Sequence, residues 1–236
     1  SRPPAAPPGR GVRPPTAVAY NADMPCILAI ETSTDAGSVA LLVGTRVFES
    51  ESQPGQAHSA WVLPAISGLL REAGVALDQV DAIAFGSGPG SFTGLRLACG
   101  IAQGLALGTA LPVVGVCSLA ALALASGASR VWVGVDARMR EIYYAGYAVD
   151  GDEVRTLIEP ACAAPELVPA PDGADWYAAG SALAVYREVL LPRLASHCIV
   201  MEPNVVASAA AVARIAALRL ARGEAIDCAL AAPLYV

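Results

Sequence analysis

The order of the apolar segments from residue 26 onward restricts this chain to a small set of folds. CILAIETS reads as a buried strand, which a turn at TDAG joins to a second strand, SVALLV. Gly44 then leads into TRVFESES, whose alternation of apolar and polar residues predicts a third strand. Three strands joined by short turns predict an antiparallel meander at the start of the fold.

Helical periodicity begins after this meander. Over residues 58–73, apolar residues recur on one face of a helix at Val62, Ile66, Leu69, Leu70 and Ala73. Pro64 removes a backbone hydrogen bond there and predicts a kink. The segments that follow alternate between strand and helix: DAIAFGSG, a helix from Ser91 or Thr93, LPVVGV and SLAALALA. The order β-β-β-α-β-α-β-α predicts an α/β fold, a mixed sheet with helices on its faces.

The second half of the chain repeats this order. RVWVGVDAR and EIYYAGYAVDG predict a hairpin and VRTLIE a third strand, followed by a strand at DWYAAG, a helix over residues 182–191, a short strand at CIVM and a helix over residues 205–222. We therefore expect two similar lobes, residues 24–125 and 126–236, and the last helix is a candidate to pack back on the first lobe. Residues 1–23, which begin SRPPAAPPGRGVRPP, predict a disordered leader or a cloning remnant.

Composition excludes several function classes. All 15 basic residues are arginine, so no lysine can form a Schiff base or bind phosphate in a Walker loop. The net charge of -6 argues against a chain that binds a nucleic-acid backbone by itself. Six cysteines without a C-x-x-C pair exclude a zinc ribbon and indicate buried free thiols in a reducing cytoplasm. The uncharged run over residues 97–129 is interrupted by Pro112 and Gly115, which argues against a membrane span.

The stretch FGSGPGSFTGLRLACGIAQGLALG is the most unusual part of the sequence. Its spacing is G-x-G-x-x-x-G, which matches neither a Walker loop nor a dinucleotide-binding turn. Two interpretations remain open. The glycines form only a sharp turn before a capped helix, or the turn and the helix start bind an anion. The candidate anion site consists of Gly88, Gly90, Ser91, Thr93 and Arg96.

Three further glycines, Gly100, Gly104 and Gly108, lie at four-residue spacing along one side of the predicted helix. Each costs about 1 kcal/mol relative to alanine in a helix. Such a cost is explained if another backbone approaches closely. The spacing leaves open whether the neighbour is the helix over residues 58–73, the sheet or a second chain.

Three carboxylates occupy predicted hairpin turns. Glu31 and Asp35 flank the turn ETSTDAGS, and Asp136 stands at the corresponding place in DARMRE. Two such turns facing each other across a cleft would suit a magnesium–nucleotide complex, but Asp, Ser, Thr and Gly are also ordinary turn residues. The only histidines, His58 and His197, form no H-x-x-x-H pair and no evident triad, so we expect no metal site and no catalytic residue.

Several segments together resemble the TsaB family, also called YeaZ: ILAIETSTDAGSVAL, QAHSAWVLPAI, DAIAFGSGPGSFTGLRLACGIAQGLA, VVGVCSLAALA and GVDARMREIYYAGY. The likeness covers residues 24–235. It implies an actin-like, ATPase-superfamily (ribonuclease-H-like) fold of two lobes. It also implies a non-catalytic subunit that activates TsaD in the transfer of threonylcarbamoyl to adenosine 37 of tRNA. The chain lacks the two metal-binding histidines of TsaD, since the helix after the fifth strand reads CSLAALALA. Glu31-Thr32-Ser33 also departs from the Asp, Gly, Thr pattern of an actin-like phosphate loop.

The resemblance further implies that residues 59–73 and 93–107 pair with TsaD or with another copy of the chain. The interface residues would be Ser59, Trp61, Val62, Ile66, Leu70, Leu97, Gly100, Ile101 and Gly104. A TsaE-type ATPase would join through the complex, and tRNA would be contacted only indirectly. The isolated chain would bind no cofactor, and ATP or ADP with magnesium would bind only in the assembled complex. The alternative is a free-standing actin-like ATPase or small-molecule kinase that uses Glu31, Asp35 and Asp136. A glycoprotease, the older description of the wider family, lacks support because the metal histidines are missing.

Overall fold

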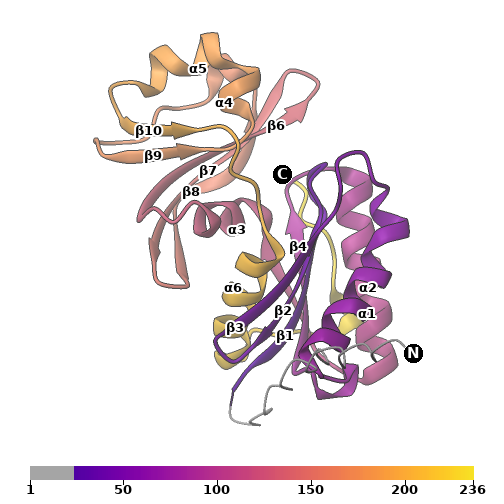
Figure 1. Ribbon diagram of the computed structural model, residues 1–236. Coiled ribbons are helices and arrows are strands. Elements are labelled where there is room, and N and C mark those ends of the chain that lie inside the picture. Colours follow the sequence, from indigo (N-terminus) through magenta and orange to yellow (C-terminus); the bar gives the residue numbers. More distant parts are fainter. Residues whose placement is uncertain (1–23) are drawn as a thin grey trace, which may run out of the picture.

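The computed structural model describes residues 24–236, so the predicted leader lies outside the described residues. The described chain forms two five-stranded sheets with helices against their faces (Figure 1). In the first sheet the strand order is β3-β2-β1-β4-β5. Its strands are β1 (Cys26–Glu31), β2 (Ser38–Val43), β3 (Arg46–Glu51), β4 (Ala82–Gly88) and β5 (Val113–Cys117). β1 pairs antiparallel with β2 and parallel with β4, so the sheet is mixed, as the sequence predicts.

Helices bury both faces of the first sheet. Leu28 and Ile30 of β1 pack towards α1 (His58–Ala73) and α2 (Phe92–Thr109), which both cover this side of the sheet (Figure 1). The alternate residues, Ile27 and Ala29, pack towards α6 (Ala209–Ala221). Burial on both faces explains why β1 and β2 are continuous apolar runs rather than alternating ones. α6 follows the second sheet in sequence but packs on the first.

The second sheet has the order β10-β9-β6-β7-β8, which is the same arrangement of an antiparallel meander followed by two parallel strands. Its strands are β6 (Arg130–Arg138), β7 (Glu141–Asp150), β8 (Glu153–Ala163), β9 (Trp176–Ala179) and β10 (Cys198–Glu202). One face packs on α4 (Ala182–Val185) and α5 (Arg187–Leu194) around the buried Trp132 and Trp176. The other face meets α3 (Ser118–Ala125), which lies between the sheets. The short 3-10 turns are Leu77–Gln79, Pro165–Leu167 and Cys228–Leu230. The predicted fold class of two similar lobes is confirmed.

Three local predictions differ from the structure. The helix over residues 182–191 is divided into α4 and α5 at Tyr186, whose hydroxyl donates to Asp136 across 2.9 Å. The last helix begins at Ala209, because Ser208 caps it by accepting from the Ala211 amide at 3.2 Å. The six cysteines are all free, but only Cys26 and Cys99 are buried. Within residues 24–236, none of the helices has the combined length and apolar composition that crossing a bilayer requires.

Candidate functional site

The glycine-rich turn between β4 and α2 packs the chain closely against itself. Of the two predicted caps, Ser91 and Thr93, Ser91 is the N-cap of α2, and its hydroxyl accepts from the Gly94 amide at 3.4 Å. The Ser91 amide in turn donates to the Ser33 carbonyl at 2.7 Å. A Cβ atom on Gly90 would overlap Ser33, and one on Gly94 would overlap the Thr32 carbonyl. These glycines therefore allow the backbone after β1 to lie directly on the start of α2.

The side chain of Arg96 contacts Phe92 and Tyr235 rather than the glycines of the turn. Its guanidinium stacks over the Phe92 ring, 3.7 Å from the ring centroid, and its Nε donates to the Tyr235 hydroxyl at 3.3 Å. Of the five residues of the candidate anion site, Gly90 and Ser91 are thus engaged with the β1 turn, and Arg96 is held by the C-terminal segment. Gly90, Ser91 and Thr93 line a cleft between the lobes, whereas Gly88 and Arg96 do not.

Glu31 belongs to the interior of the first lobe. Its side chain is 1% exposed, and its carboxylate accepts from the Ser33 amide at 2.6 Å and from the Ser118 hydroxyl at 2.9 Å. Burial raises the pKa of this carboxyl above its usual value, although the hydrogen bonds from Ser33 and Ser118 act in the opposite direction. A Cβ atom on Gly86 would overlap the carboxylate. Glu31 therefore joins β1, β4 and α3, and it does not line the cleft between the lobes.

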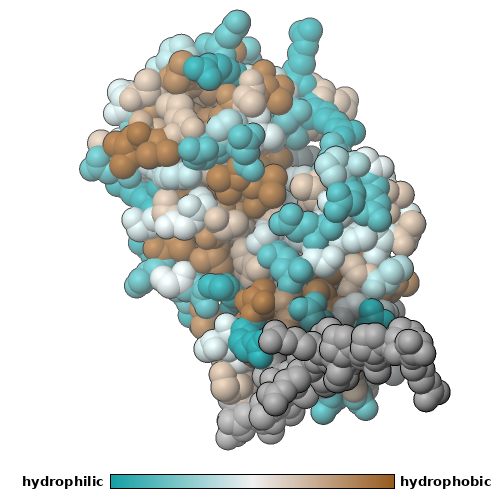
Figure 2. Space-filling view, in the orientation of Figure 1, coloured by the Kyte–Doolittle hydropathy of each residue, from teal (hydrophilic) through white to brown (hydrophobic). Residues whose placement is uncertain are grey.

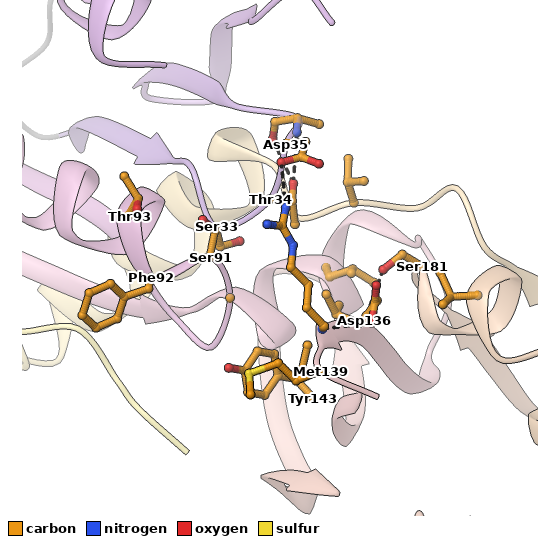
Figure 3. A pocket seen from close by; sticks show the side chains of 18 of the residues that line it. Ser33, Thr34, Asp35, Ser91, Phe92, Thr93, Asp136, Met139, Tyr143 and Ser181 are labelled. Carbon is orange, nitrogen blue, oxygen red and sulfur yellow. Dashed lines mark hydrogen bonds and ion pairs between the residues drawn. The ribbon is translucent and has the colours of Figure 1, made fainter. Parts of the chain in front are cut away.

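A cleft of about 650 Å³ separates the lobes (Figure 3). Asp35 and Asp136 line it from the β1–β2 turn and from β6. Asp35 forms an ion pair with Arg138 at 3.5 Å. The Asp136 carboxylate accepts from the Tyr186 hydroxyl and from the Arg138 amide, each at 2.9 Å. Both carboxylates predicted for magnesium are thus engaged within the chain.

The remaining lining of the cleft combines hydroxyl-bearing and apolar side chains, and the hydroxyls belong to Ser33, Thr34, Ser91, Thr93, Tyr143 and Ser181. Val185, Val205 and Val206 contribute to the apolar part, and Figure 2 shows apolar surface where the lobes meet. Among residues 24–236, no group of three or more His, Cys, Asp and Glu side chains is placed to hold a metal ion.

The β6–β7 hairpin has an unusual backbone that the sequence did not reveal. Arg138, Met139 and Arg140 have φ values of 61°, 50° and 64°, a left-handed conformation that is costly for residues with a Cβ atom. The side chain of Met139 lies at the mouth of the cleft, where the residue is 92% exposed. No glycine or asparagine in DARMRE marks this turn, so no sequence signal identified it.

The outer sides of α1 and α2 carry exposed glycines and leucines. Cβ atoms added to Gly100, Gly104 and Gly108 would meet nothing within 4 Å. Leu63 on α1 is 49% exposed and Leu107 on α2 is 76% exposed. We call this surface the two-helix face, and it consists of Ser59, Leu63, Gly100, Gly104, Leu107 and Gly108.

The nine residues that the resemblance assigned to an interface differ in burial: six are exposed or half-buried, and three are buried. Ser59, Gly100 and Gly104 are exposed, and Leu70, Leu97 and Ile101 are half-buried. The other three are Trp61, Val62 and Ile66, which are 9%, 0% and 3% exposed and pack between α1 and the first sheet. The structure thus corrects the expectation that these three offer a free surface. Their helical periodicity indicates the side of α1 that faces its own sheet, whereas Leu63 lies outside that periodicity and is exposed.

The segment after α6 is a further feature that the sequence did not predict. It returns to the first lobe and runs beside α2 (Figure 1). Ile226 pairs with Val113, the Gln103 side chain donates to the Ala231 carbonyl at 3.1 Å, and the Leu234 amide donates to the Ser87 carbonyl at 2.7 Å. This segment therefore borders the two-helix face on the side of α2.

The chain is similar in sequence to proteins whose names refer to the threonylcarbamoyl modification of tRNA adenosine. Residues 51–233 match the family model described as TsaD: tRNA N6-adenosine threonylcarbamoyltransferase. The tRNA threonylcarbamoyladenosine biosynthesis protein TsaB of Escherichia coli is 43% identical over 145 residues, which cover 57% of this chain and 62% of the relative. The protein of the same name from Haemophilus influenzae is 46% identical over 122 residues, covering 50% and 52%. The chain thus spans less than two thirds of these curated relatives in the matched regions.

A solved structure extends the likeness to nearly the whole fold. YeaZ from Pseudomonas aeruginosa superimposes with a TM-score of 0.82 at 38% sequence identity. The match covers 90% of this chain and 100% of that chain. The family model and this structure agree with the motifs in the sequence. The chain belongs to the TsaB (YeaZ) family.

Proposed function

We propose that this chain is a non-catalytic partner subunit that binds and activates a TsaD-type enzyme in the transfer of threonylcarbamoyl to adenosine 37 of tRNA. The names of its relatives, which refer to tRNA threonylcarbamoyladenosine biosynthesis, support the process. The observation that carries the partner role is the two-helix face, on which a Cβ atom added to any of three helical glycines would meet nothing within 4 Å among residues 24–236.

The three glycines lower the stability of α2, and a close contact with another polypeptide would offset that cost. Each destabilises α2 by about 1 kcal/mol relative to alanine. Nothing within residues 24–236 approaches Gly100, Gly104 or Gly108 closely enough to require the missing Cβ atom. A helix of another polypeptide gains close backbone contact there, and Leu63 and Leu107 supply apolar area that is otherwise left in water.

The cleft supports a non-catalytic role for the isolated chain. Glu31 is buried and hydrogen-bonded, Asp35 pairs with Arg138, and Asp136 accepts from Tyr186. In the proposed complex a TsaE-type ATPase acts through TsaD, tRNA is contacted indirectly, and any ATP or ADP with magnesium binds only after assembly. The chain would act in the cytoplasm, and its homodimer would use the same helices that bind TsaD.

Reconstitution tests the proposal. The modified adenosine is measured with TsaD, a TsaE-type ATPase and tRNA, in the presence and absence of this chain, and native mass is recorded for the mixture of the two subunits. We expect a complex with TsaD and a loss of product when the chain is omitted. TsaD working at full rate alone would contradict the proposal.

A pair of matched variants locates the surface. Leu107→Arg places a charge on the two-helix face, whereas Leu167→Arg places one at a site of similar exposure, 74%, next to the second sheet. We expect Leu107→Arg to abolish complex formation and Leu167→Arg to preserve it. Equal effects of the two substitutions would show that TsaD binds elsewhere.

A further inference from the structure

Arg96 is an arginine whose position is fixed at the protein surface. It is the only charged residue of α2. Its guanidinium stacks on Phe92 at 3.7 Å, and its Nε donates to the Tyr235 hydroxyl at 3.3 Å. The Phe92 and Tyr235 rings are themselves in contact, with centroids 5.9 Å apart. A long side chain that would otherwise sample many rotamers is therefore held in one orientation before any ligand arrives.

The charge of Arg96 is not compensated within the described chain. The ion pairs in residues 24–236 use Arg138, Arg214, Arg219 and Arg222, and none includes Arg96. Its partner, the Tyr235 hydroxyl, is neutral, and no described residue accepts a hydrogen bond from its two terminal nitrogens. The guanidinium thus keeps a pair of donors, the fork that matches a carboxylate.

The rings that hold Arg96 leave apolar area exposed. Phe92 is 55% exposed, Tyr235 is 56% exposed, and Leu230 in the same C-terminal segment is 71% exposed. Phe92 also lines the edge of the cleft, and in Figure 3 its side chain is directed away from Asp35 and Asp136. Two aromatic rings left in water next to one fixed cation, with an exposed leucine in the same C-terminal segment, are typical of an interface rather than of a solvated surface.

This cluster continues the two-helix face. Side chains four residues apart lie on the same side of a helix, so Phe92, Arg96, Gly100 and Gly104 follow one another along α2. The face consequently has glycines in its middle, a leucine towards one end and a preoriented cation with aromatic side chains at the other. The C-terminal segment supplies Tyr235 to that end.

We infer that Arg96 binds a carboxylate of the TsaD-type partner, and that Phe92 and Tyr235 orient it and add apolar contact at that end of the interface. This inference rests on the proposed function. A single ion pair at the end of an otherwise uncharged helical face fixes the register of the two proteins, since any shift leaves the guanidinium unpaired. A second copy of the chain is a poorer occupant, because its α2 offers no carboxylate, the only one on its α1 is Glu72 in the last turn, and its own Arg96 would be repelled.

Calorimetric titration of this chain with the TsaD-type subunit, at low and at high salt, tests the inference. Arg96→Glu should weaken binding by about tenfold to a hundredfold, because a charge-assisted hydrogen bond is lost and a repulsion is introduced. Arg96→Met should reduce the salt dependence of binding. Tyr235→Phe, which removes only the hydroxyl, should weaken binding severalfold. The matched control Arg155→Glu changes an exposed arginine on β8 and should bind as the wild type does.

A charge-reversal screen then identifies the carboxylate. Replacing one acidic residue of the TsaD-type subunit with arginine should restore binding to Arg96→Glu and to no other variant. Arg96→Glu that binds as tightly as Arg155→Glu, with thermal unfolding unchanged, would reject the inference and leave the proposed function standing. Wild-type protein that does not bind the subunit at all would reject both. An Arg96→Glu effect on self-association alone would assign the carboxylate to a second copy and contradict the inference.

Discussion

The glycines of the two-helix face allow stability and binding to be changed in opposite directions. We consider the double substitution Gly100→Ala and Gly104→Ala. Because the added Cβ atoms would meet nothing within 4 Å, neither alanine strains the chain. Each should stabilise α2 by about 1 kcal/mol through its higher helix propensity. The free energy of unfolding should therefore rise by about 2 kcal/mol, which corresponds to an increase in Tm of about 4 to 8 °C for a chain of this size.

The same two methyl groups should weaken binding to TsaD. They prevent the close approach of a partner backbone, and overpacking of this kind costs about 1 to 3 kcal/mol, or roughly fivefold to a hundredfold in affinity. Urea unfolding and calorimetric titration of the same preparation measure the two effects. A variant that is more stable but binds less tightly would match the account.

Gly94→Ala is the matched contrast on the same helix. Its Cβ atom would overlap the Thr32 carbonyl, so this substitution should destabilise the chain by several kcal/mol. If Gly100→Ala and Gly104→Ala also lowered stability, the two-helix face would be covered from within the chain. If they raised stability and left affinity for TsaD unchanged, the face would be free but not the docking surface. Either result would refute the reasoning.

Three further predictions concern the core, the buried carboxyl and the cleft. Ile66→Ala should lower the free energy of unfolding in urea by about 3 kcal/mol, because Ile66 is 3% exposed. Leu63→Ala should leave the stability nearly unchanged and weaken binding to TsaD, because Leu63 is exposed. Equal destabilisation by the two substitutions would contradict the assignment of Ile66 to the core and Leu63 to the surface. The pKa of Glu31 is raised in the folded state, so with rising pH the carboxyl loses its proton in the unfolded chain before it does so in the folded chain. The stability that protonated Glu31 contributes is therefore lost as pH rises from the usual carboxyl pKa through the raised pKa of the folded state. Glu31→Gln should therefore flatten urea stability across that pH range, and an unchanged pH profile would show that Glu31 does not titrate there. Titration of ATP with magnesium into the isolated chain should give no saturable heat, and tight binding would favour the ATPase alternative.

Local signals made much of the fold predictable. The bounds of α1 and the Ser91 cap of α2 follow from apolar periodicity and a hydroxyl before a helix, both of which act within a few residues. The break between α4 and α5 could not be predicted in the same way. It occurs at Tyr186, whose side chain bonds to Asp136, a residue 50 positions away.

The candidate site was less predictable because periodicity identifies a buried side without identifying its neighbour. Trp61, Val62 and Ile66 form the apolar side of α1, and they bury it against their own sheet. The role of Arg96 depends on Tyr235, which is 139 residues away in sequence. The extended C-terminal segment carries no periodic signal, so nothing in the sequence indicated that it borders α2.

The central claim is that the two-helix face is the surface that binds TsaD. Hydrogen–deuterium exchange of this chain, alone and with a TsaD-type subunit, tests that claim most directly. We expect new protection in α1, in α2 and in the C-terminal segment around Tyr235, with exchange in β8 and β10 unchanged. Protection confined to the cleft or to the second lobe, with α1 and α2 exchanging as in the free chain, would contradict the account.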